Sequence, residues 1–108
     1  MEADYRKKIQ EVFDRIEKAL SEVDPDIAEC EQSMGSLTIT LAVHSRCILS
    51  SQPSVGQLWL ALAARGTAFH FNFEPTQQLW LDDKAKNIEV FSFLSRYLEE
   101  STGMRIKL

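Results

Sequence analysis

Alternation of apolar and polar side chains runs through the middle of the sequence in a series of short segments, and this feature most constrains the fold. In the clearest segment, 57–62, every second residue is a leucine, and the residues between are glutamine, tryptophan and alanine. A period of two is typical of a β-strand with one buried face. Because the turns between segments are short, neighbouring strands are expected to pair antiparallel. The segments expected as strands are 26–31, 36–42, 46–50, 57–62, 68–73 and 77–81.

Two segments with a helical period flank these strands. Residues 4–23 carry apolar side chains at a spacing close to 3.6, and Asp24–Pro25 is expected to end this helix because the residue before a proline disfavours the helical conformation. A second helix is expected over 88–101, with Asn87 as its N-cap and Gly103 just beyond its end.

The elements predict a single α+β domain that spans residues 1–108. Its expected architecture is a two-layer α/β sandwich, in which the N- and C-terminal helices pack on one face of an antiparallel sheet of about six strands. In the tail, Met104, Ile106 and Leu108 alternate with polar residues, and we expect all three to cover the seam between the helices.

Several classes of protein are disfavoured by the sequence. No apolar run approaches the ~20 residues that cross a bilayer, and the N-terminal stretch lacks the apolar core of a secretory signal, so neither a membrane-spanning nor a secreted protein is expected. Cys30 and Cys47 are too far apart for a CxxC metal motif and are expected to be reduced thiols. No nucleophile–His–Asp pattern and no Gly-rich phosphate loop is present, so no catalytic residue is predicted.

The second face of the predicted sheet has no partner in this sequence. Its expected residues are Thr38, Thr40, Gln57, Trp59, His70 and Asn72. A large indole among polar side chains is typical of an interaction surface. Two alternatives stay open, since a loop or the tail could cover Trp59, or a bulge could turn it inward. Alternation alone does not decide whether Trp80 is buried or exposed.

Charge is distributed unevenly along the chain, whose net charge is -4. No lysine or arginine occurs from Ala19 to Ser45, and five acidic residues fall within ten positions of this stretch, whereas the rest of the chain is close to balanced in charge. A patch of one sign disfavours nucleic acid and anionic membranes and favours cations or a basic protein surface as partners. We call the following residues the acidic ridge: Asp14, Glu17, Glu22, Asp24, Asp26, Glu29 and Glu31.

Carboxylates are oxygen ligands that suit Fe(II), Mn(II), Mg(II) and Ca(II), so the acidic ridge is the candidate metal site. Spacing alone favours the alternative that the ridge only keeps the protein soluble and protects an edge strand. No histidine or cysteine is placed to fix a strong site, so any metal is expected to bind weakly and to stay partly hydrated.

An acid-rich end of the first helix is followed by the strand 35–41 and by a segment that runs from Gln52 through Gln57-Leu58-Trp59-Leu60-Ala61. In these features, and over nearly its whole length, the chain resembles the frataxin family, including its bacterial form. The strands 69–72 and 79–82 and a C-terminal helix follow in the family's order. Among the departures, Ser50 and Ser51 stand where the family usually has asparagine and a basic residue, and the ridge is thinner than in typical members.

The resemblance implies an iron-binding regulator of iron–sulfur cluster assembly with at most weak ferroxidase activity. It implies that the acidic ridge binds Fe(II) or Fe(III) and meets a basic patch of a cysteine desulfurase, and that the open sheet face meets the scaffold protein and the desulfurase. The residues implied in partner binding are Gln52, Gln57, Trp59, His70 and Asn72. A monomer is expected, with oligomers driven by iron, in the cytoplasm of a bacterium or in the mitochondrial matrix or a mitochondrion-derived organelle of a eukaryote. The alternative function is a metal-independent protein-interaction module that uses the Trp59 face.

Overall fold

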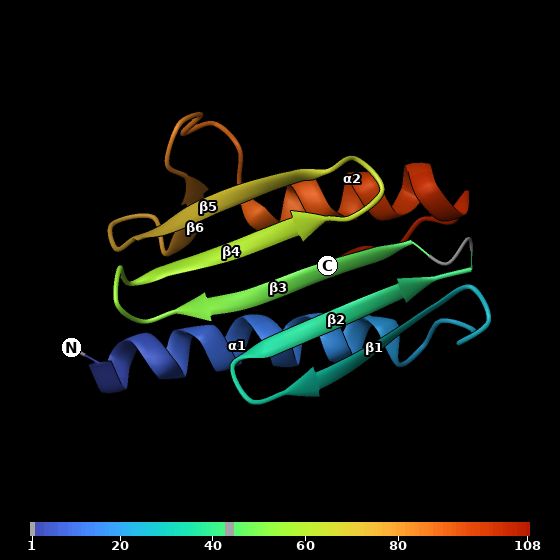
Figure 1. The fold of residues 1–108 in the computed structure, drawn as a ribbon, viewed down its shortest axis with the longest axis horizontal. Coiled ribbons are helices and arrows are strands. Elements are labelled where there is room, and N and C mark those ends of the chain that lie inside the picture. The colour runs from blue at the N-terminus through green and yellow to red at the C-terminus, as the bar shows by residue number, and fades with distance from the viewer. Residues whose placement is uncertain (1, 43–44) are drawn as a thin grey trace.

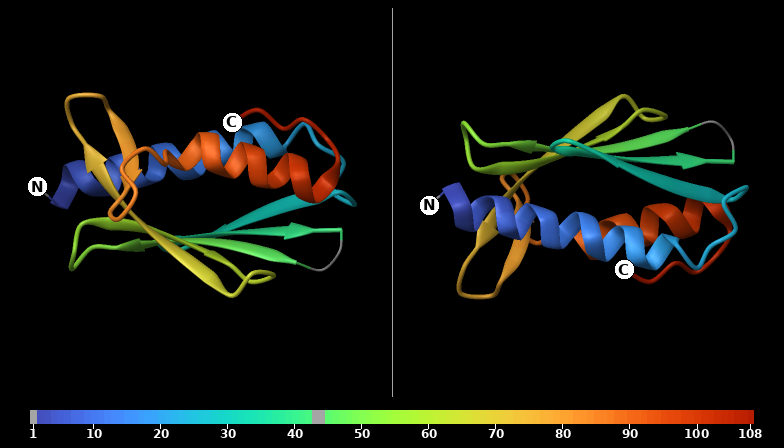
Figure 2. Two further views of the ribbon diagram at one scale, coloured as in Figure 1. Left: turned by 90° about the horizontal axis from the view of Figure 1, so that it is seen from above. Right: turned by 90° about the horizontal axis from the view of Figure 1, so that it is seen from below.

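The computed structural model describes residues 2–42 and 45–108, which form two layers (Figures 1 and 2). The helices α1 (Glu2–Leu20) and α2 (Val90–Thr102) lie side by side on one face of a six-stranded sheet. Neighbouring strands pair antiparallel in the order β1-β2-β3-β4-β5-β6. The strands are β1 (Ala28–Ser33), β2 (Ser36–Leu41), β3 (Arg46–Gln52), β4 (Gln57–Leu62), β5 (Thr67–Glu74) and β6 (Leu79–Asp82). The predicted fold class is confirmed.

Strand boundaries differ from the prediction where turns take residues away from the strands. β1 begins at Ala28 rather than at residue 26, because Asp24 accepts hydrogen bonds from the backbone N–H groups of Asp26 and Ile27 and forms a turn there. β6 begins at Leu79 rather than at residue 77, because Gln78 has a φ of 57°, a conformation typical of turns. α1 also ends earlier than predicted, at Leu20.

The N-cap of α2 is Glu89, so the prediction of Asn87 is wrong. The Glu89 carboxylate accepts hydrogen bonds from the backbone N–H groups of Phe91 and Ser92, at 2.8 and 3.0 Å. These are donors that the first turn of a helix leaves without a partner. Gly103 ends the helix with a φ of 74°, and its N–H donates to Glu99.

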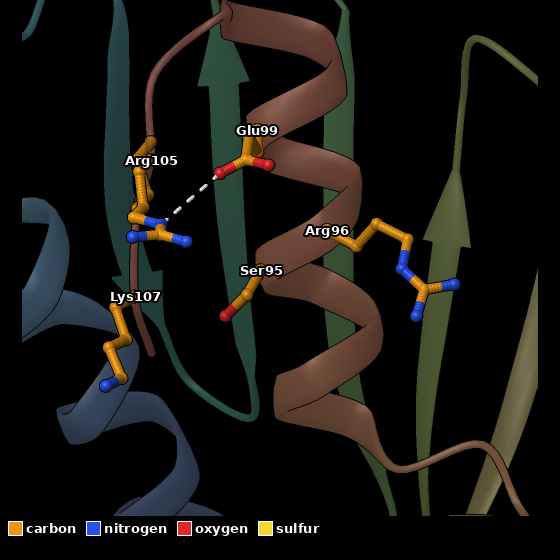
Figure 3. Close-up of a pocket in the computed structure, with 6 residues that line it drawn as sticks. Ser95, Arg96, Glu99, Arg105 and Lys107 are labelled. Carbon is orange, nitrogen blue, oxygen red and sulfur yellow. Dashed lines mark ion pairs between the residues drawn. The ribbon is translucent and has the colours of Figure 1, made fainter.

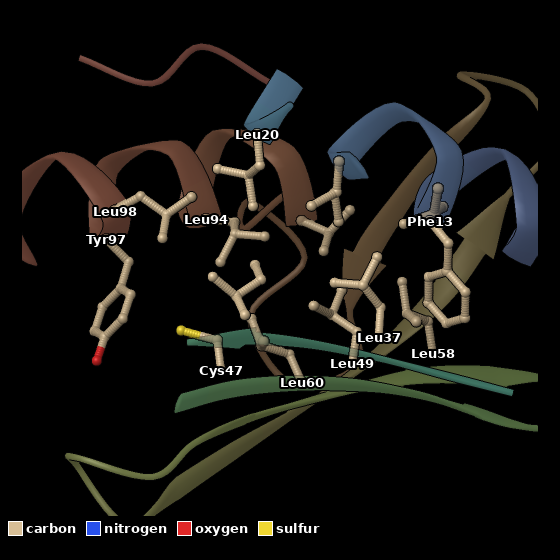
Figure 4. Packing of buried hydrophobic residues seen from close by; sticks show 14 of the residues in the cluster. Phe13, Leu20, Leu37, Cys47, Leu49, Leu58, Leu60, Leu94, Tyr97 and Leu98 are labelled. Carbon is tan, nitrogen blue, oxygen red and sulfur yellow. The ribbon is translucent and has the colours of Figure 1, made fainter. Parts of the chain in front are cut away.

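The core lies between the two layers, where strand residues point toward the helices (Figure 4). In β2 and β4 every second side chain is fully or almost fully buried, and in β3 the same holds for Cys47 and Leu49. The core side chains labelled in the figure are Phe13, Leu20, Leu37, Cys47, Leu49, Leu58, Leu60, Leu94, Tyr97 and Leu98. The opposite face of β2 to β4 carries the polar residues together with Ile48, Trp59 and Ala61.

The C-terminal tail packs against the helix layer. Ile106 is buried in the core, and the Leu108 backbone N–H donates to Ser95 Oγ at 3.1 Å. Arg15 of α1 donates to the Leu108 carbonyl at 2.8 Å, so the tail bridges the two helices. The prediction is wrong for Met104, which is exposed, because it follows directly on the turn at Gly103.

Candidate partner-binding face and acidic ridge

Cross-strand pairing gathers the residues predicted for partner binding into two adjacent rows on the open face of the sheet. In one row, Trp59 of β4 pairs with Ser50 of β3 and with His70 of β5. In the next row, Gln57 pairs with Gln52 and with Asn72. All five predicted residues are therefore neighbours, although they come from three strands.

Trp59 stands on the open face and outside the core. It alternates with Leu58 and Leu60, which are fully buried on the helix side, and its own side chain is half-buried. The indole stacks on the His70 ring with centroids 4.2 Å apart and planes inclined by 14°. Its Nε1–H donates to Gln57 Oε1 at 2.9 Å. The tail lies on the helix layer and does not cover this side chain.

Gln57 connects the two rows through its amide group. While its oxygen accepts from Trp59, its Nε2 donates to Asn72 Oδ1 at 3.1 Å and to Asp83 Oδ2 at 3.4 Å. The same Asp83 oxygen lies 3.8 Å from His70 Nδ1. Sequence analysis missed Asp83, which follows β6 and is brought beside His70 by the β5–β6 register, as its N–H donates to the His70 carbonyl. Only the exact register would have revealed it.

Tyr5 of α1 holds the ends of β3 and β4 together beneath this face. Its hydroxyl donates to the Gln57 carbonyl and accepts from the Gln52 backbone N–H at 2.8 Å. Burial raises the pKa of Tyr5, and the Gln52 N–H acts in the opposite direction. The helix thus fixes the backbone from which two of the predicted partner-binding side chains, Gln52 and Gln57, extend.

One further apolar side chain, Ile48, is exposed on the open face and was missed from the sequence. It lies in the row next to Trp59, between Thr38 and Ala61, and 37% of its surface is exposed. The alternation of Ile48 with the buried Cys47 and Leu49 is the signal that could have identified it.

The acidic ridge extends over three elements and both sides of the sheet edge. Asp14 and Glu17 lie on α1, and Glu22, Asp24 and Asp26 lie in the α1–β1 connection. Glu29 and Glu31 of β1 alternate with Ala28 and Cys30, which point toward α1, and so project on the opposite side of the strand. All seven side chains are exposed. Within residues 2–42 and 45–108, no three Asp, Glu, His or Cys side chains lie close enough together to hold a metal ion.

Two glutamines that sequence analysis missed occupy part of the acidic ridge. Gln32 Nε2 of β1 donates to Glu17 Oε1 at 3.0 Å and to Asp14 Oδ1 at 3.3 Å. Gln10 Nε2 donates to the same Asp14 oxygen at 2.8 Å and to Gln32 Oε1 at 2.9 Å. The helix end of the ridge is thus hydrogen-bonded to the edge strand.

Neither cysteine adds a thiolate ligand at neutral pH. Burial, and then the nearby carboxylates of Glu17 and Glu29, raise the pKa of Cys30. Burial raises the pKa of Cys47 to about 11. A thiol must lose its proton to bind a metal well, so both groups are poor ligands here.

The surface also contains a pocket of about 380 Å³ between α2 and the tail (Figure 3). Ser95, Arg96, Glu99, Arg105, Ile106 and Lys107 line it. Arg105 of the tail and Glu99 of α2 form an exposed ion pair at 3.8 Å beside it. This pocket belongs to the helix layer and contains no residue predicted for iron or partner binding.

In the part of the chain that the structure describes, no helix is both long and apolar enough to span a membrane.

Comparison with known proteins places this geometry in a family. The profile of the frataxin-like domain matches residues 1–104. The chain belongs to the frataxin-like family.

Two curated relatives of this frataxin-like chain come from bacteria. The iron–sulfur cluster assembly protein CyaY of Stutzerimonas stutzeri (strain A1501) is 35% identical over 102 residues, which cover 94% of this chain and 89% of that protein. The CyaY protein of Delftia acidovorans (strain DSM 14801 / SPH-1) is 31% identical over 99 residues, which cover 92% of this chain and 82% of that protein.

Solved structures agree with the frataxin-like fold. Frataxin from Psychromonas ingrahamii superposes with a TM-score of 0.87 at 20% identity, and covers 98% of this chain and 95% of that one. A trimeric frataxin from Saccharomyces cerevisiae, in its ferrous complex, superposes with a TM-score of 0.72 at 24% identity, and covers 96% of this chain and 88% of that one. At these identities the likeness concerns the fold.

Proposed function

We propose that this frataxin-like protein acts in iron–sulfur cluster assembly by docking onto a cysteine desulfurase and its scaffold protein. The observation that carries the proposal is the half-exposed Trp59, which is held by a hydrogen bond to Gln57 and by the stack on His70. No helix or strand among residues 2–42 and 45–108 covers its face of the sheet. The names of the CyaY relatives support the pathway. Their bacterial sources favour the cytoplasm as the location.

Trp59 is the proposed anchor of the docked complex, because buried aromatic side chains contribute most to protein interfaces. The amide groups of Gln52, Gln57 and Asn72 surround it and supply the polar contacts. The acidic ridge lies at the β1 edge of the same sheet and meets a basic patch of the desulfurase. Opposite charges of this kind increase the rate of association more than the final affinity.

Iron is the proposed cargo of the acidic ridge. The exposed carboxylates suit a hard, partly hydrated cation. Asp14 and Glu17 already accept hydrogen bonds from Gln10 and Gln32, so Glu22 and Asp26 in the α1–β1 connection are the more accessible ligands. Asp24 lies beside them, although one of its carboxylate oxygens accepts the Asp26 N–H. Weak binding follows from this arrangement and fits a protein that must release its metal.

The docking proposal is tested by replacing Trp59 and measuring affinity for the desulfurase–scaffold complex by calorimetry. Trp59→Ala is expected to weaken binding by about 2 kcal/mol, or roughly 30-fold. Met104→Ala is the matched control, since Met104 is also an exposed apolar side chain but lies on the helix layer. Equal affinity of the two variants would remove Trp59 from the interface.

The metal-independent module remains the second candidate, and the hydrogen bonds of Gln32 to the ridge carboxylates favour it. An anaerobic Fe(II) titration followed by NMR separates the two functions. Iron cargo predicts selective broadening of amide signals from residues 14–31, which Glu22→Gln with Asp24→Asn reduces. Glu99→Gln with Glu100→Gln is the control for lost charge away from the ridge. If the ridge signals stay unchanged while Trp59→Ala still abolishes docking, the metal-independent module is the function.

A further inference from the structure

We propose that His70 positions Trp59 for docking and makes the docking pH-dependent, with the tighter complex formed when His70 is protonated. The inference rests on the proposed docking function of the Trp59 face. It assigns to His70 the role of a positioning residue, which acts on the partner through the indole.

The geometry fixes the indole from two directions. The His70 ring covers one face of the Trp59 ring at 4.2 Å, nearly parallel to it. The indole Nε1–H donates a hydrogen bond to Gln57 Oε1 at 2.9 Å. On the opposite flank, the residue paired with Trp59 is Ser50, whose side chain is small. The second face of the indole is therefore the side on which a partner side chain can pack.

The charges around His70 determine the sign of the pH effect. Asp83, from the connection after β6, lies 3.8 Å from His70 Nδ1, while β4 contributes the uncharged Trp59 and Gln57. On β5 itself, the next residues on the same face are Ala68 and Asn72, which do not titrate. Protonation thus adds an attraction to Asp83 and a cation–π attraction to the indole. Both hold the stack together more firmly.

His70 is not needed to fill the core. Its side chain is 36% exposed, and that of Asp83 is 28% exposed. Replacing His70 is therefore expected to leave the domain folded, which a melting curve followed by circular dichroism checks. Phenylalanine keeps a flat ring against Trp59 but cannot take a proton, while alanine removes the ring.

The first measurement uses the free protein, so it does not depend on any partner. Between pH 8 and pH 5.5 the wild-type Trp59 indole N–H signal in the NMR spectrum is expected to shift together with the His70 ring signals. In His70→Phe the indole shift disappears, because phenylalanine cannot take a proton. An indole signal that does not follow His70 would overturn the proposal.

The second measurement compares affinity for the desulfurase–scaffold complex at pH 6 and pH 8. At each pH the affinity of the wild type is divided by the affinity of His70→Phe. Titration of groups on the partner affects both proteins equally and cancels in this ratio. The ratio is expected near one at pH 8 and about 2–5 at pH 6, the effect of an exposed cation–π contact. His70→Ala is expected to bind less tightly at both pH values. A ratio that is the same at both pH values would show that the proton on His70 has no role.

Failure of the inference is distinguishable from failure of the proposed function. If Trp59→Ala binds as well as wild type, the docking function itself is wrong. If Trp59→Ala loses affinity but the His70→Phe ratio is flat, the function stands and the positioning role of His70 is wrong.

Discussion

The two tryptophans show how differently the two faces of one sheet use the same side chain. Trp80 of β6 is 4% exposed and lies edge-on to Tyr5 and Phe73, with ring centroids 6.3 and 5.3 Å away. Trp59 of β4 is half-buried on the opposite face and stacks on His70. Both strands bury their even-numbered residues, so the position of each indole in its strand, and not its size, determines which face it joins.

The largest expected effect is on the inner face. Trp80→Ala is expected to lower the free energy of unfolding by about 3–5 kcal/mol, because it leaves a large cavity among aromatic rings. Trp59→Ala should stay within about 1 kcal/mol of wild type, as surface substitutions usually do. Urea unfolding followed by far-UV circular dichroism measures both. Similar losses for the two variants would contradict the assignment of the two faces.

The C-terminal tail also contains one buried and one exposed apolar side chain, only two residues apart. Ile106 is buried in the core, while Met104 is 37% exposed. Ile106→Ala is expected to lower the free energy of unfolding by about 3 kcal/mol, and Met104→Ala by less than about 0.5 kcal/mol. An unchanged unfolding midpoint for Ile106→Ala would mean that the tail does not hold the helices together in solution.

Prediction from sequence succeeded where one period extends over a whole element. The alternation in β2 and β4 gave both strands within a residue and placed Trp59 on the open face. Prediction was weaker at the start of α2, where a side chain hydrogen-bonds to the backbone. Glu89 takes this role although glutamate is an uncommon N-cap residue. Asp83 and Gln32 were missed because their partners come from distant segments that only the pairing register and the helix packing bring close. The roles of the acidic ridge and the Trp59 face stay predictions.

Titration of the buried Cys47 thiol on the inner face is expected to have a smaller effect on the free energy of unfolding. Burial raises the pKa of Cys47 from 9.0 to about 11, so the folded state disfavours the thiolate. A raised pKa contributes stability that is fully present below pH 9 and is lost as the pH rises through about 11. That loss is about 2–3 kcal/mol for Cys47.

The free energy of unfolding, measured in urea at intervals between pH 8 and 11, tests the Cys47 contribution. Cys47→Ala is expected to remove this part of the pH dependence whatever its effect at pH 8. Tyr5 and Cys30, whose pKa values are also raised, remain in both proteins and cancel in the comparison. An equally steep decline in Cys47→Ala would assign the pH dependence to other groups.

The smallest expected effect on the free energy of unfolding comes from the acidic ridge, at the β1 edge of the sheet. Like charges in the acidic ridge repel one another, so Glu22→Gln, Asp24→Asn and Glu29→Gln together are expected to raise the free energy of unfolding by about 1 kcal/mol at low salt. Asn keeps the oxygen that accepts the Asp26 N–H. The gain should shrink at 0.5 M salt, where the Debye length is only about 4–5 Å. Glu99→Gln with Glu100→Gln is the control: both acids pair with arginines, so the free energy of unfolding should not rise. A ridge variant that is less stable and binds Fe(II) as tightly as wild type would contradict both the repulsion and the metal role.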